Sequence, residues 1–322
     1  MPRWSRPSRP PRVILERVRG FRGKGTRCVC PGFFAGALWA FLVQSAGMTQ
    51  SQGLNGDDGA MSAASQALPG AIEVDSADRG HDFPVEPLKV LITGGSRGIG
   101  LAAAHALVEA GAQVALLARD AGRLARARGE LAGDVVIWPM DLSDPASVLL
   151  LTEKVEAWGT PDAVIASAAL MSDKASKLAH TSPEHWRAVM AANLDGVFHT
   201  LRSTVPLMMQ RRSGSVIVLS ACLGRMSGPG NTGGLAPYRV SKAAVNALVR
   251  NTAHEAGLGR RGVFVDAVCP GHCRTDMGGP DAPRSARQGA DTAVWLAMRG
   301  RGGAAESEPT GVLWEDREVV PW

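Results

Sequence analysis

Tyrosine is almost absent from this chain: Tyr238 is the only one among 322 residues, and aromatic residues make up 5% of the total. It lies in the stretch PYRVSK, four residues before Lys242. Side chains at this spacing share one face of a helix. A neighbouring ammonium lowers the pKa of a phenol from its usual value of about 10, so the pair predicts a proton donor usable near neutral pH. The alternative is an amphipathic helix whose tyrosine packs and whose lysine is solvated.

The chain also lacks a uniform positive charge. Residues 1–47 hold eight arginines and Lys24 against Glu16, a net charge of +8, whereas the whole chain carries +5. Residues 48–322 are therefore slightly acidic. Their charge gives no indication of nucleic-acid binding.

Cysteine is scarce, and its spacing is irregular. After residue 47 the chain has only Cys222, Cys269 and Cys273. An odd number without framework spacing predicts reduced thiols in a reducing compartment, so we expect a cytoplasmic protein. The stretch CPGHC at 269–273 has too few ligands for a structural zinc, which needs four, and we expect no metal.

Long hydrophobic runs are missing as well. The apolar run at 33–43 has eleven residues, whereas a membrane span needs about 20, so no stable span is expected. Basic residues before this run and small residues after it resemble a secretory signal. The interpretation we favour is that translation begins at Met48 or Met61 and that residues 1–47 are not native coding sequence. Residues 48–86, rich in Gly, Ser, Ala and Asp, predict a disordered lead-in.

From residue 87 to 322, short apolar segments alternate with segments of helical period. This alternation predicts one α/β domain, a Rossmann-type, doubly wound parallel sheet with helices on both faces. Strands are expected at 88–93, 113–118, 135–140, 162–167, 215–220 and 263–268, and helices at 101–111, 120–131, 145–158, 183–211 and 238–256.

A glycine-rich loop, TGGSRGIG at 93–100, lies between the first expected strand and the first helix. Glycines let the backbone approach a pyrophosphate, and the helix N-terminus supplies donors and a positive dipole. In this position the loop indicates dinucleotide binding.

The loop's spacing, Gly94-x3-Gly98-x-Gly100, resembles the TGxxxGxG motif of the short-chain dehydrogenase/reductase family. The Tyr-x3-Lys pair resembles that family's second signature, and the resemblance covers roughly residues 88–322. The C-terminal half is similar to carbonyl-reductase-type members. The resemblance implies an oxidoreductase that transfers a hydride between NADP(H) and the carbonyl or alcohol of a small molecule, working as a homodimer or homotetramer.

The resemblance also implies roles for particular residues. Tyr238 would be the general acid or base, and Lys242 would lower its pKa and bind the nicotinamide ribose. Asn193 would order a water in a proton path to Lys242, and the hydroxyl of Ser220 would stabilise charge on the carbonyl oxygen. The implied cofactor-binding residues are Gly94, Ser96, Arg97, Gly98, Ile99, Gly100, Arg119, Asp141, Tyr238, Lys242, Pro270, Gly271 and Thr275.

The second strand ends at Ala118-Arg119, where an acidic residue would hold the ribose hydroxyls of NAD. Here that position is an arginine. Arg119 and Arg97 can pair with a 2′-phosphate, because guanidinium suits phosphate bidentately. The alternative is two solvated arginines beside a helix start. We therefore predict a preference for NADP.

Two positions depart from the family pattern. The family's fifth strand carries two serines, the second of them catalytic, and here Ala221 occupies the second position and Ser220 the first. Adjacent strand residues face opposite sides, so Ser220 needs a bulge or an early strand end to reach the site. The family's NNAG is ASAA at 166–169. These departures keep open an alternative, a nucleotide-binding sensor or partner module with little turnover. Residues 223–236 and 276–289 are expected to form the substrate mouth.

Overall fold

The computed structural model describes residues 86–172, 177–228, 233–299 and 308–322. The expectations for residues 1–47 and 48–86 fall outside this part of the chain, apart from Glu86. The segment 223–236 is described except for residues 229–232.

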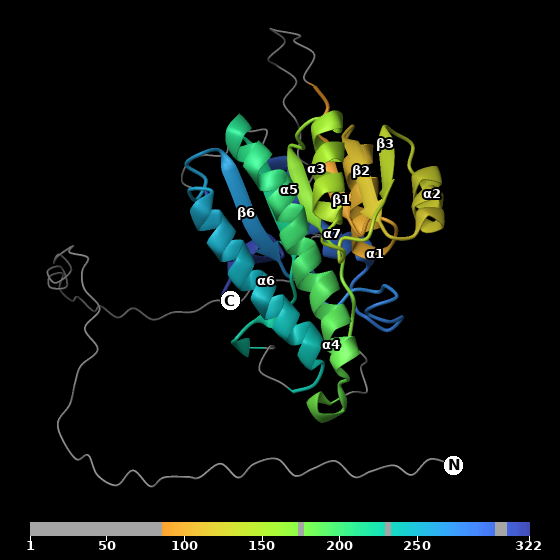
Figure 1. The fold of residues 1–322 in the computed structure, drawn as a ribbon, viewed down its shortest axis with the longest axis vertical. Coiled ribbons are helices and arrows are strands. Elements are labelled where there is room, and N and C mark those ends of the chain that lie inside the picture. Colours follow the sequence, from red (N-terminus) through yellow and green to blue (C-terminus); the bar gives the residue numbers. More distant parts are fainter. Residues whose placement is uncertain (1–85, 173–176, 229–232, 300–307) are drawn as a thin grey trace, which may run out of the picture. The chain divides into compact units, whose positions relative to one another are not determined.

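A mostly parallel sheet forms the centre of the domain, with strands in the order β3-β2-β1-β4-β5-β6-β7-β8 (Figure 1). All six expected strands are present. Two further strands, β7 and β8, form an antiparallel pair at the edge, and sequence periodicity did not predict them. The strands are β1 Lys89–Thr93, β2 Gln113–Ala118, β3 Val135–Pro139, β4 Ala163–Ala166, β5 Gly214–Leu219, β6 Val263–Val268, β7 Leu313–Glu315 and β8 Glu318–Val320.

Helices cover both faces of this sheet, as expected for a doubly wound fold. One apolar core lies between the sheet and α3, α5 and α6, and a second lies between the sheet and α1, α2 and α7. Figure 1 shows α3, α5 and α6 in front of the strands. The helices are α1 Gly98–Glu109, α2 Ala121–Glu130, α3 Ser147–Trp158, α4 Pro183–Met190, α5 Gly196–Arg211, α6 Ala236–Glu255 and α7 Ala286–Arg299.

The central strands read as unbroken apolar runs because both of their faces are buried. Every residue of β4, β5 and β6 is buried. The strand order reverses between β1 and β4: the chain runs outward from β1 to β2 and β3 on one side, and from β4 to β5 and β6 on the other. In open α/β sheets, ligands bind in the crevice outside the carboxyl ends of the strands at such a switch point.

The long helix expected at 183–211 is correct in extent but is not continuous. A π-helical turn at Ala191–Asp195 separates α4 from α5. Asn193 lies in this turn and is fully buried. Such turns are rare and occur frequently at functional sites.

The expected mouth segment 276–289 is only partly a loop, because its last residues form the first turn of α7. A short 3-10 turn at Cys222–Gly224 follows β5. Within the described ranges, no helix combines the length and apolar character that a membrane crossing requires.

Candidate active site

A cavity of about 960 Å³ opens at the carboxyl ends of the central strands. Its walls combine segments that are far apart in sequence: the glycine-rich loop, the end of β5, the first turns of α6 and the loop after β6. Of the predicted site residues, only Asn193 is not on its wall. The others are Gly94, Ser96, Arg97, Gly98, Ile99, Gly100, Arg119, Asp141, Ser220, Tyr238, Lys242, Pro270, Gly271 and Thr275.

The glycine-rich loop contains glycines where a side chain would clash with neighbouring backbone. Gly94 has φ +69°, and a Cβ there would lie 2.7 Å from Ala168 N. A Cβ on Gly100 would lie 2.6 Å from Gly94 O. Arg97, at the start of α1, makes no side-chain cap, so the first N–H groups of the helix keep their hydrogen-bonding capacity. These features fit the pyrophosphate of a dinucleotide.

The ASAA segment retains a brace between β1 and β4. Ser167 Oγ donates to Thr93 O at 2.8 Å, and Ala168 N donates to Thr93 Oγ1 at 3.3 Å. The serine therefore holds the two strands together at the switch point, in a segment that lacks the family's two amides.

Tyr238 lies in the first turn of α6, and its ring is on the cavity wall. Its backbone N donates to Ser172 Oγ at 3.0 Å, which fixes the start of the helix. Among the described residues, none forms a hydrogen bond with its phenol hydroxyl. The side chain is buried, at 6% exposure, while the hydroxyl remains available to a molecule in the cavity.

The pKa of Tyr238 is raised, opposite to the direction expected from its lysine neighbour. Burial is the main cause, and the nearby Cys269 and Cys222 act in the same direction. Lys242 Nζ lies 5.8 Å from the centroid of the Tyr238 ring and donates to Leu219 O at 2.6 Å. Burial also lowers the pKa of Lys242 to about 8. The lysine is thus held by a strand carbonyl, and it loses its proton at a lower pH than a solvated lysine.

This buried lysine predicts a pH dependence of stability. Its pKa is lower in the folded protein than in the unfolded chain. Between about pH 8 and 10.5 the folded state therefore binds fewer protons than the unfolded state, and stability rises with pH. Between pH 7.5 and 9.5, we expect Lys242 to add about 2 kcal/mol to the free energy of unfolding. In Lys242→Met this contribution should be absent, which urea titrations of both proteins at the two pH values would show. Parallel pH profiles for the two proteins would contradict the prediction.

Asn193 acts on the site through another segment. Its Nδ2 donates to Leu170 O at 2.9 Å and to Ser241 Oγ at 3.0 Å, and its Oδ1 accepts from Leu170 N at 2.6 Å. The amide therefore pairs with both backbone groups of Leu170, which lies on the cavity wall. This geometry makes Asn193 a positioning residue for the segment after β4. Its two side-chain N–H groups are both engaged in these contacts.

Ser220 lies on the cavity wall, but its hydroxyl is directed toward α6. Its Oγ donates to Asn246 Oδ1 and lies 3.5 Å from Lys242 O. The strand ends at Leu219, one residue before its expected end, and its pairing with β6 is regular up to that residue, without a bulge. The following residue, Ala221, also lines the cavity and carries only a methyl group there.

The predicted adenine end of the cavity carries both arginines. Arg119 Nη1 lies 4.0 Å from Asp141 Oδ2. Burial opposes ionisation of Asp141, but hydrogen bonds from Ser143 and the charge of Arg119 outweigh it and keep its pKa below the usual value. Arg97 forms an ion pair with Asp276 from the loop after β6. Both arginines are more than half exposed, so they remain available to a phosphate.

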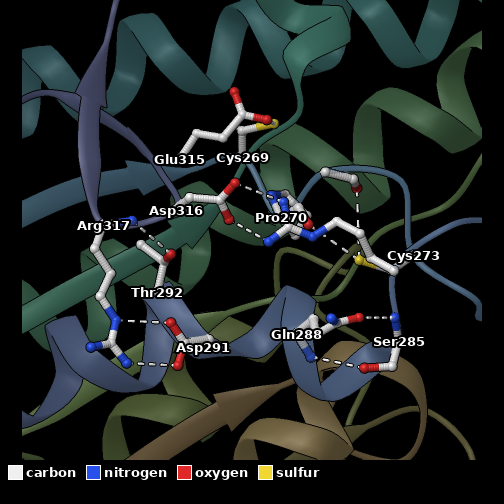
Figure 2. A network of polar contacts seen from close by, with 12 residues as sticks. Cys269, Pro270, Cys273, Ser285, Gln288, Asp291, Thr292, Glu315, Asp316 and Arg317 are labelled. Atoms are coloured by element: carbon white, nitrogen blue, oxygen red, sulfur yellow. Dashed lines mark hydrogen bonds and ion pairs between the residues drawn. The ribbon is translucent and has the colours of Figure 1, made fainter. Parts of the chain in front are cut away.

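The loop after β6 is anchored by contacts that sequence reasoning missed. Arg284 forms an ion pair with Asp316 in the turn between β7 and β8, and Arg274 N donates to Arg284 O at 2.7 Å. Figure 2 shows Asp316 with its polar contacts beside Cys273 and the start of α7. Arg284 and Asp316 lie 32 residues apart in the chain, and no local sequence pattern predicts such a pairing.

The described residues contain no group of three or more His, Cys, Asp or Glu side chains placed to hold a metal ion. The doubly wound sheet, the glycine-rich loop and the cavity at the switch point define the class: a Rossmann-type dinucleotide-binding protein.

Comparison with known proteins identifies the family. The family model for short chain dehydrogenases matches residues 88–285, so the chain belongs to the short chain dehydrogenase family, whose members are nicotinamide-dependent oxidoreductases. It is 32% identical over 188 residues to the 3-oxoacyl-[acyl-carrier-protein] reductase of Escherichia coli (strain K12), covering 58% of this chain and 74% of that protein. It is 31% identical over 217 residues to the corresponding enzyme of Thermotoga maritima, covering 66% and 84%.

Solved structures agree with this assignment. A 3-oxoacyl-[acyl-carrier protein] reductase from Brucella melitensis, solved with bound NAD, matches with a TM-score of 0.61 and 27% identity, over 71% of this chain and 89% of that one. A second structure, from Brucella melitensis ATCC 23457, matches with a TM-score of 0.62 and the same identity and coverage.

Proposed function

We propose that this chain is an NADP(H)-dependent reductase that transfers a hydride to the carbonyl carbon of a small molecule. The observation that carries the proposal is the Tyr238 hydroxyl, which has no partner among the described residues and lies on the wall of the cavity that contains the phosphate loop. When bound, the nicotinamide supplies the hydride chemistry. The N-terminal turn of α1 would hold its pyrophosphate, and Lys242 its ribose.

The raised pKa of Tyr238 suits the reductive direction. Because burial keeps the phenol protonated at neutral pH, its hydroxyl can donate a proton to a carbonyl oxygen as negative charge develops there. Lys242 stands beside the ring and is buried, at 2% exposure, where a positive charge acts strongly. Oxidation of an alcohol would require the phenolate, which burial disfavours.

The substrate end of the cavity is largely apolar, with Leu170, Met171, Leu223, Leu235 and Met277 on its wall. An apolar mouth suits a carbonyl compound with a hydrophobic substituent. Because the relatives are named as 3-oxoacyl-[acyl-carrier-protein] reductases, 3-oxoacyl thioesters form one candidate class, and simple aldehydes and ketones form the other.

The direct test is NADPH consumption by the purified full-length chain, followed by absorbance with a 3-oxoacyl thioester, a panel of aldehydes and ketones, and no substrate. We expect turnover with at least one carbonyl class and slower turnover with NADH. Tight NADPH binding without consumption across the panel would instead favour a nucleotide-binding sensor. The methyl group of Ala221, where the family has a catalytic hydroxyl, is the observation that keeps this second function in view.

The two positions after β5 can be tested as a pair. In Ser220→Ala, Asn246 Oδ1 loses its hydrogen-bond donor, so we expect a loss of about 1–2 kcal/mol in the free energy of unfolding and little change in turnover. In Ala221→Ser, a hydroxyl reaches the cavity, and turnover should rise by about tenfold, since one such donor contributes up to about 10²–10³ in rate. Urea titration and steady-state kinetics measure the two effects.

The opposite pattern would restore Ser220 as the functional hydroxyl. Turnover would then fall by about 10² or more in Ser220→Ala and stay unchanged in Ala221→Ser.

Cofactor preference is proposed to depend on Arg119. Its guanidinium is the group placed at the end of β2, and a charge-assisted hydrogen bond of about 1.5 kcal/mol corresponds to roughly tenfold in affinity. Arg119→Ala should therefore weaken NADPH binding by about tenfold and leave NADH binding unchanged, as measured by fluorescence titration. Arg187→Ala is the control, since this arginine is 75% exposed on α4 and is not on the cavity wall. Equal losses for both cofactors in Arg119→Ala would argue against a role in discrimination.

We further propose that residues 87–322 form the catalytic domain, that the active form is a homodimer or homotetramer, and that the protein works in the cytoplasm. The three thiols of the described residues form no disulfide, which is consistent with a reducing compartment.

A further inference from the structure

Two cysteines outside the proposed reaction meet at the carboxyl end of the sheet. Strands β5 and β6 are paired up to Leu219 and Val268. Cys222 begins the 3-10 turn that follows β5, and Cys269 comes directly after β6. The two thiols are close enough for each to shift the pKa of the other, and both are free.

The surroundings of the two thiols differ. Cys269 is buried, at 2% exposure, and its Sγ donates to Glu315 Oε1 at 3.3 Å. Figure 2 shows Cys269 and Glu315 side by side. Cys222 is partly exposed and lies on the wall of the cavity that contains Tyr238. A small solute that enters the cavity can therefore reach Cys222, whereas Cys269 is covered.

The charge states of the two thiols differ as well. The Cys269 thiol can donate its one proton to the Cys222 sulfur in place of Glu315, and this hydrogen bond is the main cause that lowers the pKa of Cys222 to about 6. The Leu223 N–H and Arg225 act in the same direction, against burial and the charge of Glu315. The same hydrogen bond, together with burial, raises the pKa of Cys269. At neutral pH these interactions favour the thiolate of Cys222 and the protonated thiol of Cys269. An accessible thiolate next to a second cysteine is the arrangement typical of redox-sensing sites.

We propose that Cys222 and Cys269 form a modification site for hydroperoxides, with Cys222 as the attacking thiol and Cys269 as the resolving thiol. The proposal rests on their adjacency at the ends of β5 and β6, on the access to Cys222 from the cavity and on the carboxylate beside Cys269.

The chemistry balances in two steps. The Cys222 sulfur attacks one oxygen of the peroxide, the O–O bond breaks, and the leaving oxyanion takes a proton from water, which leaves Cys222 as a sulfenic acid. Cys269 then gives its proton to Glu315, and its sulfur attacks the Cys222 sulfur. The S–O bond breaks, and the departing hydroxide takes the proton from Glu315 to form water. The two thiols lose two electrons, the peroxide gains them, and a disulfide remains.

The disulfide would join two segments of the cavity wall. It would link the turn after β5 to the residue that precedes Pro270, and it would replace the hydrogen bond of Cys269 to Glu315. If the proposed reductase function holds, we expect slower turnover in the oxidised form and full recovery with a dithiol reductant. This consequence rests on the proposed function, whereas the modification itself does not.

Mass spectrometry tests the site directly. The full-length chain carries Cys28→Ser and Cys30→Ser, so only three thiols remain, and it is treated with hydrogen peroxide and then alkylated. We expect a peptide pair joined through Cys222 and Cys269. Cys269→Ser should lose the disulfide and accumulate a sulfenic acid on Cys222 that a 1,3-diketone traps, and Cys222→Ser should lose both products. Cys273→Ser is the matched control and should behave like the parent, because burial raises the pKa of that thiol.

A second measurement follows the alkylation rate of Cys222 by iodoacetamide against pH. We expect a midpoint near pH 6 that moves toward about 8.5 in Cys269→Ala, because the hydrogen-bond donor is gone. A midpoint near 8.5 in the parent, oxidation of Cys273 ahead of Cys222, or a sulfenic acid on Cys222 that never resolves to a disulfide would overturn the proposal. None of these readouts uses turnover, so their failure is distinct from a failure of the reductase assignment.

Discussion

Replacing Tyr238 with Phe should abolish carbonyl reduction while leaving the protein folded and able to bind NADPH. The change removes only the phenol oxygen, which has no hydrogen-bond partner among the described residues, so the packing of the ring at the start of α6 is kept. General acid catalysis by a positioned group contributes about 10²–10⁴ in rate, and we expect kcat to fall by that factor. NADPH consumption measures the loss, and NADPH fluorescence titration and thermal unfolding measure what is retained.

The result separates the two proposed functions. Turnover in Tyr238→Phe within a few fold of the parent would remove the tyrosine from the reaction. If the parent itself consumes no NADPH, the tyrosine would be a binding residue, and Tyr238→Phe would change cofactor affinity and nothing else. Ser172→Ala is a control that loosens the backbone anchor of Tyr238 without removing its hydroxyl. It should lower kcat less than Tyr238→Phe does.

Replacing Arg299 with Met should cause the largest loss of stability among these predictions. Arg299 Nη2 lies 2.6 Å from Asp266 Oδ2 within a buried pair, with side chains 6% and 1% exposed. Its guanidinium also packs 4.7 Å from the centroid of the Phe264 ring. Breaking a buried pair leaves an uncompensated charge and costs about 3–5 kcal/mol. For a domain of this size, that corresponds to a fall of about 6–20 °C in Tm.

Arg317→Met is the matched control, because the partner of this arginine, Asp291, lies on the same helix as Arg299. Arg317 Nη2 lies 2.7 Å from Asp291 Oδ1, but both side chains are 51% exposed, so the loss should stay below about 1 kcal/mol. Urea unfolding of both variants gives the comparison. The deficit of Arg299→Met should also shrink as pH falls, because burial already raises the pKa of Asp266 and protonation removes the stranded charge. Equal losses in the two variants would show that the buried charge is not the cause.

Local sequence patterns predicted much of the fold. All six strands that periodicity predicted are present, because each central strand is an apolar run buried on both faces. The edge pair β7 and β8 escaped prediction, since its segments are three residues long and show no usable periodicity. The break between α4 and α5 at Ala191–Asp195 was not predicted either. This π-helical turn coincides with the pairing of Asn193 with Leu170, 23 residues earlier.

The candidate site likewise has features that the sequence predicted and features that only the structure revealed. By itself, the sequence determined that a phosphate loop begins the first helix and that Tyr238 and Lys242 share a helical face, because both depend on residues a few positions apart. Only the tertiary structure decided that the Ser220 hydroxyl is directed to Asn246, that the Tyr238 pKa rises with burial and that Cys222 lies against Cys269. These features depend on which segments the sheet brings together and on how much water they exclude, and that information resides in contacts between distant parts of the chain.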